Sequence, residues 1–461
     1  MSDALDATKL SEITARIDRL PIRPYPRTWL IILGIGYFFV FYDISALSYN
    51  FLSSMVTALN LSTLDLSLSV AVTLFGYLVG TYIVSTMSDL SGRRLGLIVN
   101  ALLVAIGTLI SALAFDVSSL FLGRFIAGMG MGAEISIINT YVAEVTPARV
   151  RGKMTQWSYL AGAVGLMATP FIALVVIPSS ADGWRYMFGL AALIAIVIVF
   201  MRFVMPETPR WLVLKGKVVQ AEKVVSRMED YVKKKGLEIP QPQVYPPEAF
   251  KKRFPTREIL TRKYARRLGI IAVFWFLVYF ASYASISFVP LIFVSAGFQF
   301  FSTLAYLGTG AVGYLVGALV MPYFADLWER KYLMMASCVP SIVAALLDVA
   351  ALIYNNLFLL AVATFLVTVN TALLGVCYAY TAELFPTRAR ATGFALSDGI
   401  GHIGGILGPL LFSTLVVTTA AQIVPTSTTF FILLAVIDGV AALVLLAGPR
   451  TSRKRLEEIS P

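Results

Sequence analysis

Long apolar stretches separated by short polar connections dominate the pattern of this chain. A helix needs about 20 mostly apolar residues to cross the hydrocarbon core of a bilayer, and twelve stretches reach roughly that length. They are too long and too continuously apolar to be barrel strands, which alternate apolar and polar residues. The pattern therefore predicts twelve membrane-spanning helices, at 28–56, 66–87, 95–116, 119–144, 155–178, 185–205, 268–298, 302–324, 332–353, 356–381, 392–418 and 424–447.

Composition supports a polytopic membrane protein. Of the 461 residues, 58% are hydrophobic and 14% are charged, whereas a soluble protein of this size carries about 25% charged residues. The two cysteines, Cys338 and Cys377, both lie in apolar stretches. We therefore expect neither a disulfide framework nor a metal site, and no cofactor.

The positive charge follows the topology and does not indicate a nucleic-acid partner. The net charge is +11, and residues 210–267 alone contain 16 Lys or Arg against 6 Asp or Glu. The short loops on that side of the predicted membrane are also basic, whereas Arg185 is the only basic residue in the connections on the other side. The positive-inside rule then places both termini and the central loop in the cytoplasm. We expect a monomeric, multi-pass plasma-membrane protein whose basic loops also favour anionic lipid.

Two sequence patterns recur about half a chain apart. YVAEVTPARVR at 141–151 and YTAELFPTRAR at 380–390 both fit Y-x-A-E-x-x-P-x-R-x-R, and DLSGRR at 89–94 pairs with DLWERK at 326–331. A half-chain repeat in an apolar protein indicates a two-lobed transporter whose solute binds between the lobes. The expected division is a lead (1–27), a six-helix lobe (28–205), a linker (206–267), a second six-helix lobe (268–447) and a tail (448–461).

Several motifs resemble the major facilitator superfamily. DLSGRR is similar to the superfamily's loop between helices two and three, and GRFIAGMGMG at 123–132 contains its R-x-x-x-G-x-G-x-G pattern of helix four. PETPRWL at 206–212 resembles the P-E-S-P-R-W-L sequence of sugar porters, and GHIGGILGP at 401–409 resembles the organic-ion branch. The resemblance implies an all-α fold of twelve helices in two pseudo-symmetric lobes. It also implies alternating-access transport of a small polar organic solute, and no enzymatic activity.

The substrate stays open at this point. Sugar porters place paired glutamines on helix seven and another on helix five, and those positions here hold Leu277, Val278 and Tyr159. A sugar and an organic acid therefore both remain candidates. An uncoupled uniporter and a transporter-like nutrient sensor are the alternatives to proton symport.

Ionisable residues inside a membrane are costly and are functional candidates by default. Asp43 lies about 22 Å into a helix that starts inside, and Arg124 about 8 Å into a helix that starts outside, so both reach the same depth of a ~30 Å core. The pair is either a permanent structural contact or a proton switch. The resemblance implies the switch, because proton-coupled sugar porters use these two positions for coupling. The full set is Asp43, Arg124, Glu134, Asp348, Asp398, His402 and Asp438.

Two further intramembrane groups have open roles. His402 is the only histidine and is predicted near the middle of the membrane, where it either titrates or binds an anion, or is neutral and bonded to a neighbouring helix. Glu134 either faces the cavity or contacts another helix. Polar tips on the predicted cavity-lining helices and on flanking helix five complete the candidate substrate-binding set: Tyr42, Glu134, Tyr159, Tyr283, Asn370, Tyr378 and His402.

Charged residues repeat at the predicted cytoplasmic helix ends of both lobes. Opposite charges there can form networks that hold the inside shut and break on opening. Fixing topology alone would need the Lys and Arg but not the Glu that both repeats contain. The predicted gating residues are Asp89, Arg93, Glu144, Arg149 and Arg151 in the first lobe, and Asp326, Arg330, Glu383, Arg388 and Arg390 in the second.

Overall fold

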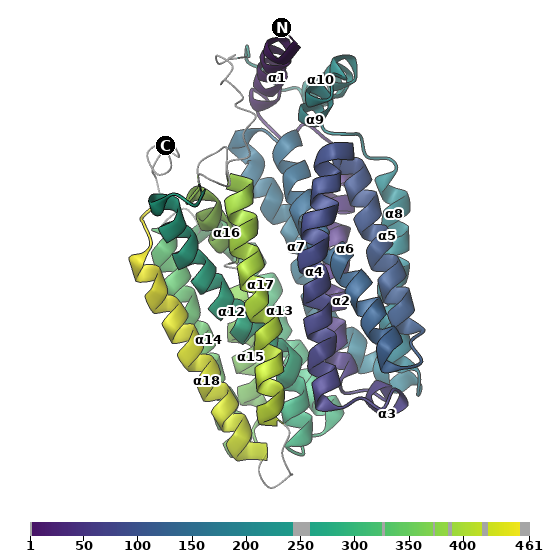
Figure 1. Cartoon of the computed structure of the whole chain (residues 1–461), viewed down its shortest axis with the longest axis vertical. Helices are drawn as coiled ribbons and strands as arrows, with labels where there is room; N and C mark the ends of the chain where they lie inside the picture. Colours follow the sequence, from purple (N-terminus) through teal and green to yellow (C-terminus); the bar gives the residue numbers. More distant parts are fainter. Residues whose placement is uncertain are drawn as a thin grey trace.

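A computed structural model shows a bundle whose long helices run roughly along its length (Figure 1). It describes residues 2–242, 259–324, 328–371, 374–385, 390–416 and 423–451. Within these residues the regular structure is helical throughout.

Six long helices make up the first half of the bundle. Local sequence fixes several of their ends. Ser62 and Asp65 form a reciprocal cap at the start of α4, and Asp116 and Ser119 do the same for α6. Gly92 has a φ of +114°, a conformation that favours glycine, and it separates α4 from α5. The bounds are α2 Arg27–Asn50, α4 Thr63–Ser91, α5 Arg93–Ala112, α6 Val117–Val145, α7 Ala148–Val176 and α8 Gly183–Arg202, with short α3 Met55–Ala58 and η1 Ile177–Ser179 between them.

The second half repeats this arrangement. Its helices are α12 Arg262–Ser295, α13 Phe300–Phe324, α14 Arg330–Ile353, α15 Leu357–Thr371, α16 Leu374–Glu383, α17 Arg390–Val416 and α18 Ile423–Val444, followed by η4 Leu445–Ala447. Helices α15 and α16 together occupy the predicted span 356–381. Among the described residues, eleven helices are long and apolar enough to cross a membrane, and 396–412 within α17 is a shorter apolar helix at the predicted eleventh span.

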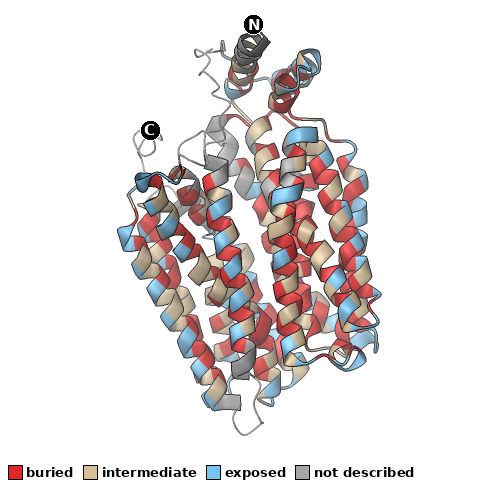
Figure 2. Cartoon of the chain, in the orientation of Figure 1, coloured by how far each residue is buried: buried red, intermediate tan, exposed pale blue. Residues whose placement is uncertain are grey.

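Most contacts between helices lie within one half of the bundle, and a smaller number of helix pairs join the two halves. In the first half α4 and α5 both pack on α6, at glycines that allow close approach: a Cβ on Gly128 would lie 2.0 Å from the Thr73 carbonyl oxygen. Across the halves, α4 contacts α17, α7 contacts α13 and α2 contacts α12. Buried residues follow these contacts, and exposed apolar residues cover the outer faces (Figure 2).

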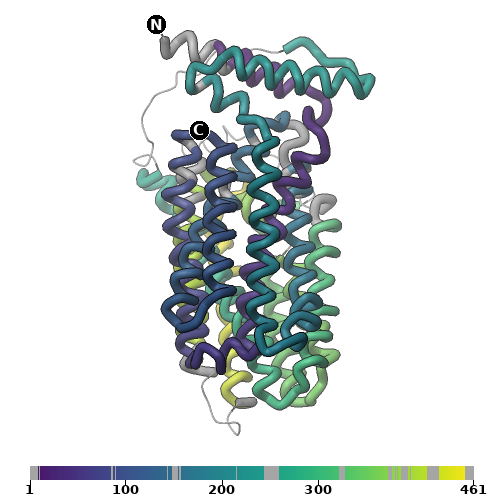
Figure 3. Tube along the Cα trace, turned by 90° about the vertical axis from the view of Figure 1, so that its right-hand side faces the viewer, coloured from purple at the N-terminus to yellow at the C-terminus, as the bar shows by residue number. Residues whose placement is uncertain are grey.

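Three shorter helices cover one end of the first half, here called the capped end. They are α1 Ser2–Asp18, α9 Pro209–Leu214 and α10 Val218–Lys233, and the last two lie in the linker. Figure 3 shows α1 and α10 lying together there. Ile13 and Ile17 of α1 share a buried cluster with Val225 and Val232 of α10. Arg16 and Arg19 add ion pairs with Glu229 at 2.8 and 2.6 Å.

Candidate transport site

A fully buried ion pair lies inside the first lobe, on α2 and α6. Arg124 Nη2 donates to Asp43 Oδ2 at 2.8 Å, and neither side chain has any exposed surface. Arg124 Nε donates to Thr73 Oγ1 of α4 at 3.2 Å, and the guanidinium carbon lies 5.4 Å from the Phe188 ring centre. The two residues that the sequence placed at one depth are thus in direct contact.

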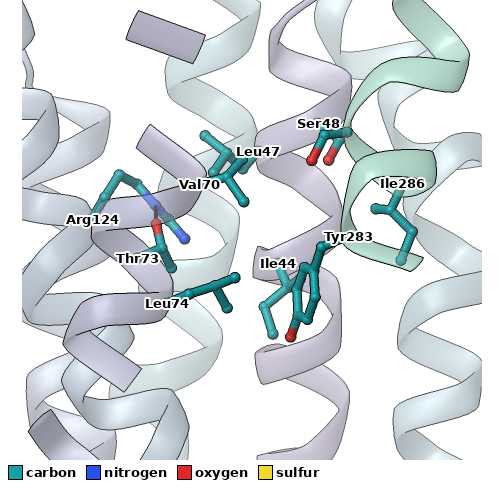
Figure 4. A pocket seen from close by; sticks show the side chains of 10 residues that line it. Ile44, Leu47, Ser48, Val70, Thr73, Leu74, Arg124, Tyr283 and Ile286 are labelled. Atoms are coloured by element: carbon teal, nitrogen blue, oxygen red, sulfur yellow. Dashed lines mark hydrogen bonds between the residues drawn. The ribbon is translucent and has the colours of Figure 1, made fainter. Parts of the chain in front are cut away.

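Arg124 of this pair lines a pocket between the two lobes. Figure 4 shows the Arg124 guanidinium directed into it beside Thr73, with Tyr283 across the space. Within the described part of the chain, Arg124 Nη1 and Asp43 Oδ1 have no hydrogen-bond partner. The lining comes from α2, α4, α6 and α12, and comprises Ile44, Leu47, Ser48, Val70, Thr73, Leu74, Arg124, Tyr283, Ile286 and Ser287.

His402 of α17 lies at the contact between the lobes. Its ring stacks on Tyr77 of α4 at a centroid distance of 4.1 Å and lies 4.5 Å from the Tyr279 ring of α12. Its Nδ1 is 2.9 Å from the Asp398 carbonyl oxygen and 3.4 Å from the Asp398 carboxylate. The hydrogen bond therefore stays within its own helix, while the ring joins the two lobes.

Aromatic side chains surround His402 on the side of the second lobe. The Tyr279 hydroxyl donates to Asp398 Oδ1 at 3.1 Å and is 3.3 Å from the Tyr378 hydroxyl. Tyr378 stacks on Trp275 at 5.2 Å. Tyr283 lies 6.1 Å from the His402 ring and also lines the Arg124 pocket, so it connects the two sites. We call Tyr77, Trp275, Tyr279, Tyr283, Tyr378, Asp398 and His402 the central cluster.

Some predicted substrate residues have partners away from this cluster. Tyr42 is fully buried inside the first lobe, where its hydroxyl donates to the Met187 carbonyl of α8 at 3.2 Å. Asn370 donates to Ser341 Oγ at 2.9 Å, within the second lobe. Tyr159 packs edge-on against Tyr37 and Phe41, with centroid distances of 6.1 and 5.7 Å. Of the three, Tyr42 has its hydroxyl bonded to a helix of its own lobe, so that hydroxyl is not directed to the second lobe.

Glu134 shows the second of the two roles that the sequence left open for it, contact with another helix. Its carboxylate forms a fully buried ion pair with Arg202 of α8, so it contacts another helix and does not line the pocket. The Arg202 guanidinium also donates to Asn100 Oδ1 at 2.8 Å. Sequence reasoning missed Arg202, which lies inside the predicted span 185–205 but was not counted among the intramembrane charges. The available signal was a basic residue inside a predicted span, which needs an acidic partner such as Glu134 when it is buried.

The charged motif of the first lobe forms a network at the capped end. Arg93 Nη2 is 3.0 Å from Glu144 Oε1, and Glu144 also accepts a hydrogen bond from Thr208. Glu207 accepts the backbone N–H groups of Arg93 and Arg94 at 3.0 and 3.1 Å, which caps the start of α5. Burial raises the pKa of Glu207 despite these hydrogen bonds. The PETP sequence therefore anchors the chain after α8 to the start of α5.

The second lobe repeats this network. Arg330 pairs with Glu383, and the Tyr380 hydroxyl donates to the Pro449 carbonyl at 2.9 Å, as Tyr141 donates to Pro206 in the first lobe at 2.9 Å. Each of these described pairs joins helix ends of a single lobe, so a latch between the lobes stays a prediction. Asp326 and Arg388 lie outside the described residues, as do the side chains of Asp89, Arg149, Arg151 and Arg390.

These features are those of a polytopic membrane protein of the major facilitator fold, with a pocket between its two halves. The family model described as "Sugar (and other) transporter" matches residues 30–461, and the chain belongs to that family. It is a multi-pass membrane transporter and not an enzyme.

Relatives and solved structures agree with this assignment. The putative metabolite transport protein YyaJ of Bacillus subtilis is 30% identical over 87% of this chain and 88% of its own length. The putative niacin/nicotinamide transporter NiaP of the same organism is 28% identical over 94% and 98%. The xylose transporter XylE from E. coli, in a partially occluded inward-open conformation, is 20% identical and covers 93% of this chain and 99% of its own, with a TM-score of 0.74.

Proposed function

We propose that this protein is a proton symporter that moves a small organic acid by alternating access. The observation that carries the proposal is the Asp43–Arg124 pair, which is fully buried and whose Arg124 lines a pocket between the lobes. A carboxylate in that position either keeps its ion pair or takes up a proton, and the choice changes the charge at the contact between the lobes. A buried ion pair is weak evidence for stability alone, which favours the coupling role.

The central cluster supports an organic acid with a flat ring over a sugar. The cluster consists mainly of aromatic rings and one imidazole, and the flat faces of such rings suit a planar solute. The two positions where sugar porters place helix-seven glutamines hold Leu277 and Val278, which pack against a hydrophobic core. Two relatives, from Bacillus subtilis and Acinetobacter baylyi, are named as niacin transporters, and niacin is a small aromatic carboxylic acid.

We also propose the orientation and the gating role that the charges imply. The capped end faces the cytoplasm of the cell and the protein lies in the plasma membrane, because the basic loops gather at that end. The Arg93–Glu144 and Arg330–Glu383 pairs each join helix ends within one lobe. These helix ends must come together when the cytoplasmic side of the protein closes. Closure of the inside is then favoured by intact networks in both lobes.

Uptake into proteoliposomes tests the function. Labelled nicotinate, its neutral counterpart nicotinamide, and xylose are compared with and without an inward proton gradient. We expect the gradient to drive accumulation of nicotinate at least ten-fold above its external concentration, and no such accumulation of xylose. Gradient-driven accumulation of xylose alone overturns the organic acid, and nicotinate uptake that merely equilibrates overturns the proton coupling.

A further inference from the structure

Arg124 donates one hydrogen bond to Asp43 and one to Thr73, which also lines the pocket. Nη2 holds Asp43 and Nε holds Thr73, while Nη1 has no partner among the described residues although the whole side chain is buried. A buried donor without an acceptor is costly, more so when it is charged. Ser48, Tyr283 and Ser287, which carry hydroxyl groups, also line the pocket. The site is therefore built to receive a small hydrogen-bond acceptor.

Charge balance specifies which acceptor fits, and when. Arg124 is the charged residue among the ten that line the pocket, and with an ionised Asp43 the pair is neutral. A proton on an Asp43 oxygen leaves the guanidinium as an uncompensated buried cation, which is strongly unfavourable. One carboxylate bound at Nη1 restores neutrality. Proton and carboxylate thus stabilise each other's binding at adjacent atoms.

Other groups around the pair do not supply that charge. On α2 the Tyr42 hydroxyl is turned to Met187, on α8 Arg124 meets the Phe188 ring, and on α12 the pocket is lined by Tyr283 and Ser287. His402 is the other cationic candidate between the lobes, but the Asp398 carboxylate already lies 3.4 Å from its Nδ1. The carboxylate beside His402 is therefore that of Asp398 on its own helix.

We propose that the Arg124 pocket is the carboxylate subsite of the transported acid, so that one proton on Asp43 and one carboxylate on Arg124 cross together and transport is electroneutral. The inference rests on the proposed function and deepens it. The cavity volume of about 20 Å³ is room for about one water molecule, so in this conformation the pocket admits at most the polar end of a solute and not a whole solute. The remainder of the solute then lies toward Tyr283 and the central cluster, which Tyr283 joins to the pocket.

Equilibrium binding of labelled nicotinate to purified protein, measured from pH 5 to pH 8, tests the subsite. The wild type should bind more tightly as pH falls, because a proton on Asp43 frees Arg124. Asp43→Asn should bind as tightly as the wild type at pH 5 and lose the pH dependence. Arg124→Gln should weaken binding at least ten-fold at every pH, and Arg124→Lys should recover part of that loss. His402→Gln, which changes the central cluster and not the carboxylate subsite, should weaken binding less than Arg124→Gln does at every pH.

The double variant Asp43→Asn/Arg124→Gln guards against a folding artefact, because it removes both buried charges and leaves neither unpaired. It should elute as a single species and still fail to bind nicotinate. Normal nicotinate affinity in this double variant, or a larger loss in His402→Gln than in Arg124→Gln, overturns the subsite while leaving proton symport intact. Absence of nicotinate and benzoate binding by the wild type overturns the proposed function and the subsite together.

A membrane potential tests the stoichiometry. Initial nicotinate uptake under a fixed proton gradient is measured with valinomycin and potassium setting the inside at 0 or −100 mV. We expect the two rates to agree within about 20%, since no net charge moves. A several-fold change with potential contradicts one proton per carboxylate.

Discussion

The two lobes have matching ends and different interiors. At the ends, Arg93–Glu144 and Tyr141–Pro206 in the first lobe correspond to Arg330–Glu383 and Tyr380–Pro449 in the second. In the interior, the first lobe holds two fully buried ion pairs, Asp43–Arg124 and Glu134–Arg202. The described interior of the second lobe has aromatic rings around His402 and Asp398 instead, and the sequence has no Lys or Arg from 268 to 329.

We infer from this difference that the two repeated lobes share the role of their ends but have different roles in their interiors. The ends serve both lobes in the same way, because both must hold helix termini together as the lobes move. The interiors are free to differ, because proton binding needs a carboxylate beside a fixed cation and solute binding needs a shaped surface. Under the proposed function, the first lobe carries the coupling charge and the carboxylate subsite, and the second carries most of the central cluster.

The largest expected effect on stability concerns the Glu134–Arg202 pair. Glu134→Gln leaves Arg202 as a buried, uncompensated charge and should cost about 3–5 kcal/mol. The matched second-lobe variant is Asp348→Asn, which removes a buried carboxylate that has no cation partner in the described structure and should cost less than about 1 kcal/mol. Thermal unfolding in detergent compares them.

A control separates charge from packing. The double variant Glu134→Gln/Arg202→Gln should recover most of the loss, because neither charge is left alone. If the single and double variants unfold at the same temperature as the wild type, the pair does not support the first lobe and the contrast between the interiors fails.

A smaller effect is expected at the two ends. Glu144→Gln and Glu383→Gln should each shift the protein toward inward-open states by about 1 kcal/mol, roughly five-fold in population. Glu144→Gln should have the larger effect, because Glu144 also accepts a hydrogen bond from Thr208. Labelling of single cysteines from the cytoplasmic side measures the shift. Unchanged labelling in both variants leaves topology as the reason for the repeated charges.

The smallest effect concerns α1, a contact that belongs to the first lobe. Burial raises the pKa of Glu229, but hydrogen bonds from Arg16 and Arg19 outweigh burial and hold it below its usual value of 4.5. A lowered pKa contributes stability above pH 4.5 that is lost as pH falls through the folded value. The protection factors of the α1 amides, which compare their exchange with that of an unfolded chain at the same pH, should therefore fall below pH 4.5.

Glu229→Gln should give the same loosening at pH 7, about 0.5 kcal/mol, while Asp230→Asn on the exposed face of α10 should not. Equal protection of α1 at pH 7 and pH 3.5 in the wild type argues that apolar packing alone holds it.

The sequence predicted the fold class, the helix spans and the Asp43–Arg124 contact, because apolar length and equal membrane depth depend on position along the chain alone. It did not predict which way a side chain faces around its helix. Tyr42 and Tyr283 looked alike in the sequence, yet one is bonded to Met187 inside its lobe and the other lines the pocket. Glu134 depended on Arg202, a partner 68 residues away, so its role required the packing of α6 on α8.

Asp43→Asn tests the central claim most directly. This variant fixes the neutral form of the carboxylate, so Arg124 stays released and no proton is carried. Gradient-driven accumulation and solute counterflow are measured for nicotinate in the same proteoliposomes. We predict that Asp43→Asn loses accumulation driven by the proton gradient, at least 50-fold, while counterflow stays within a few-fold of the wild type. Accumulation of nicotinate against its gradient by Asp43→Asn contradicts the account.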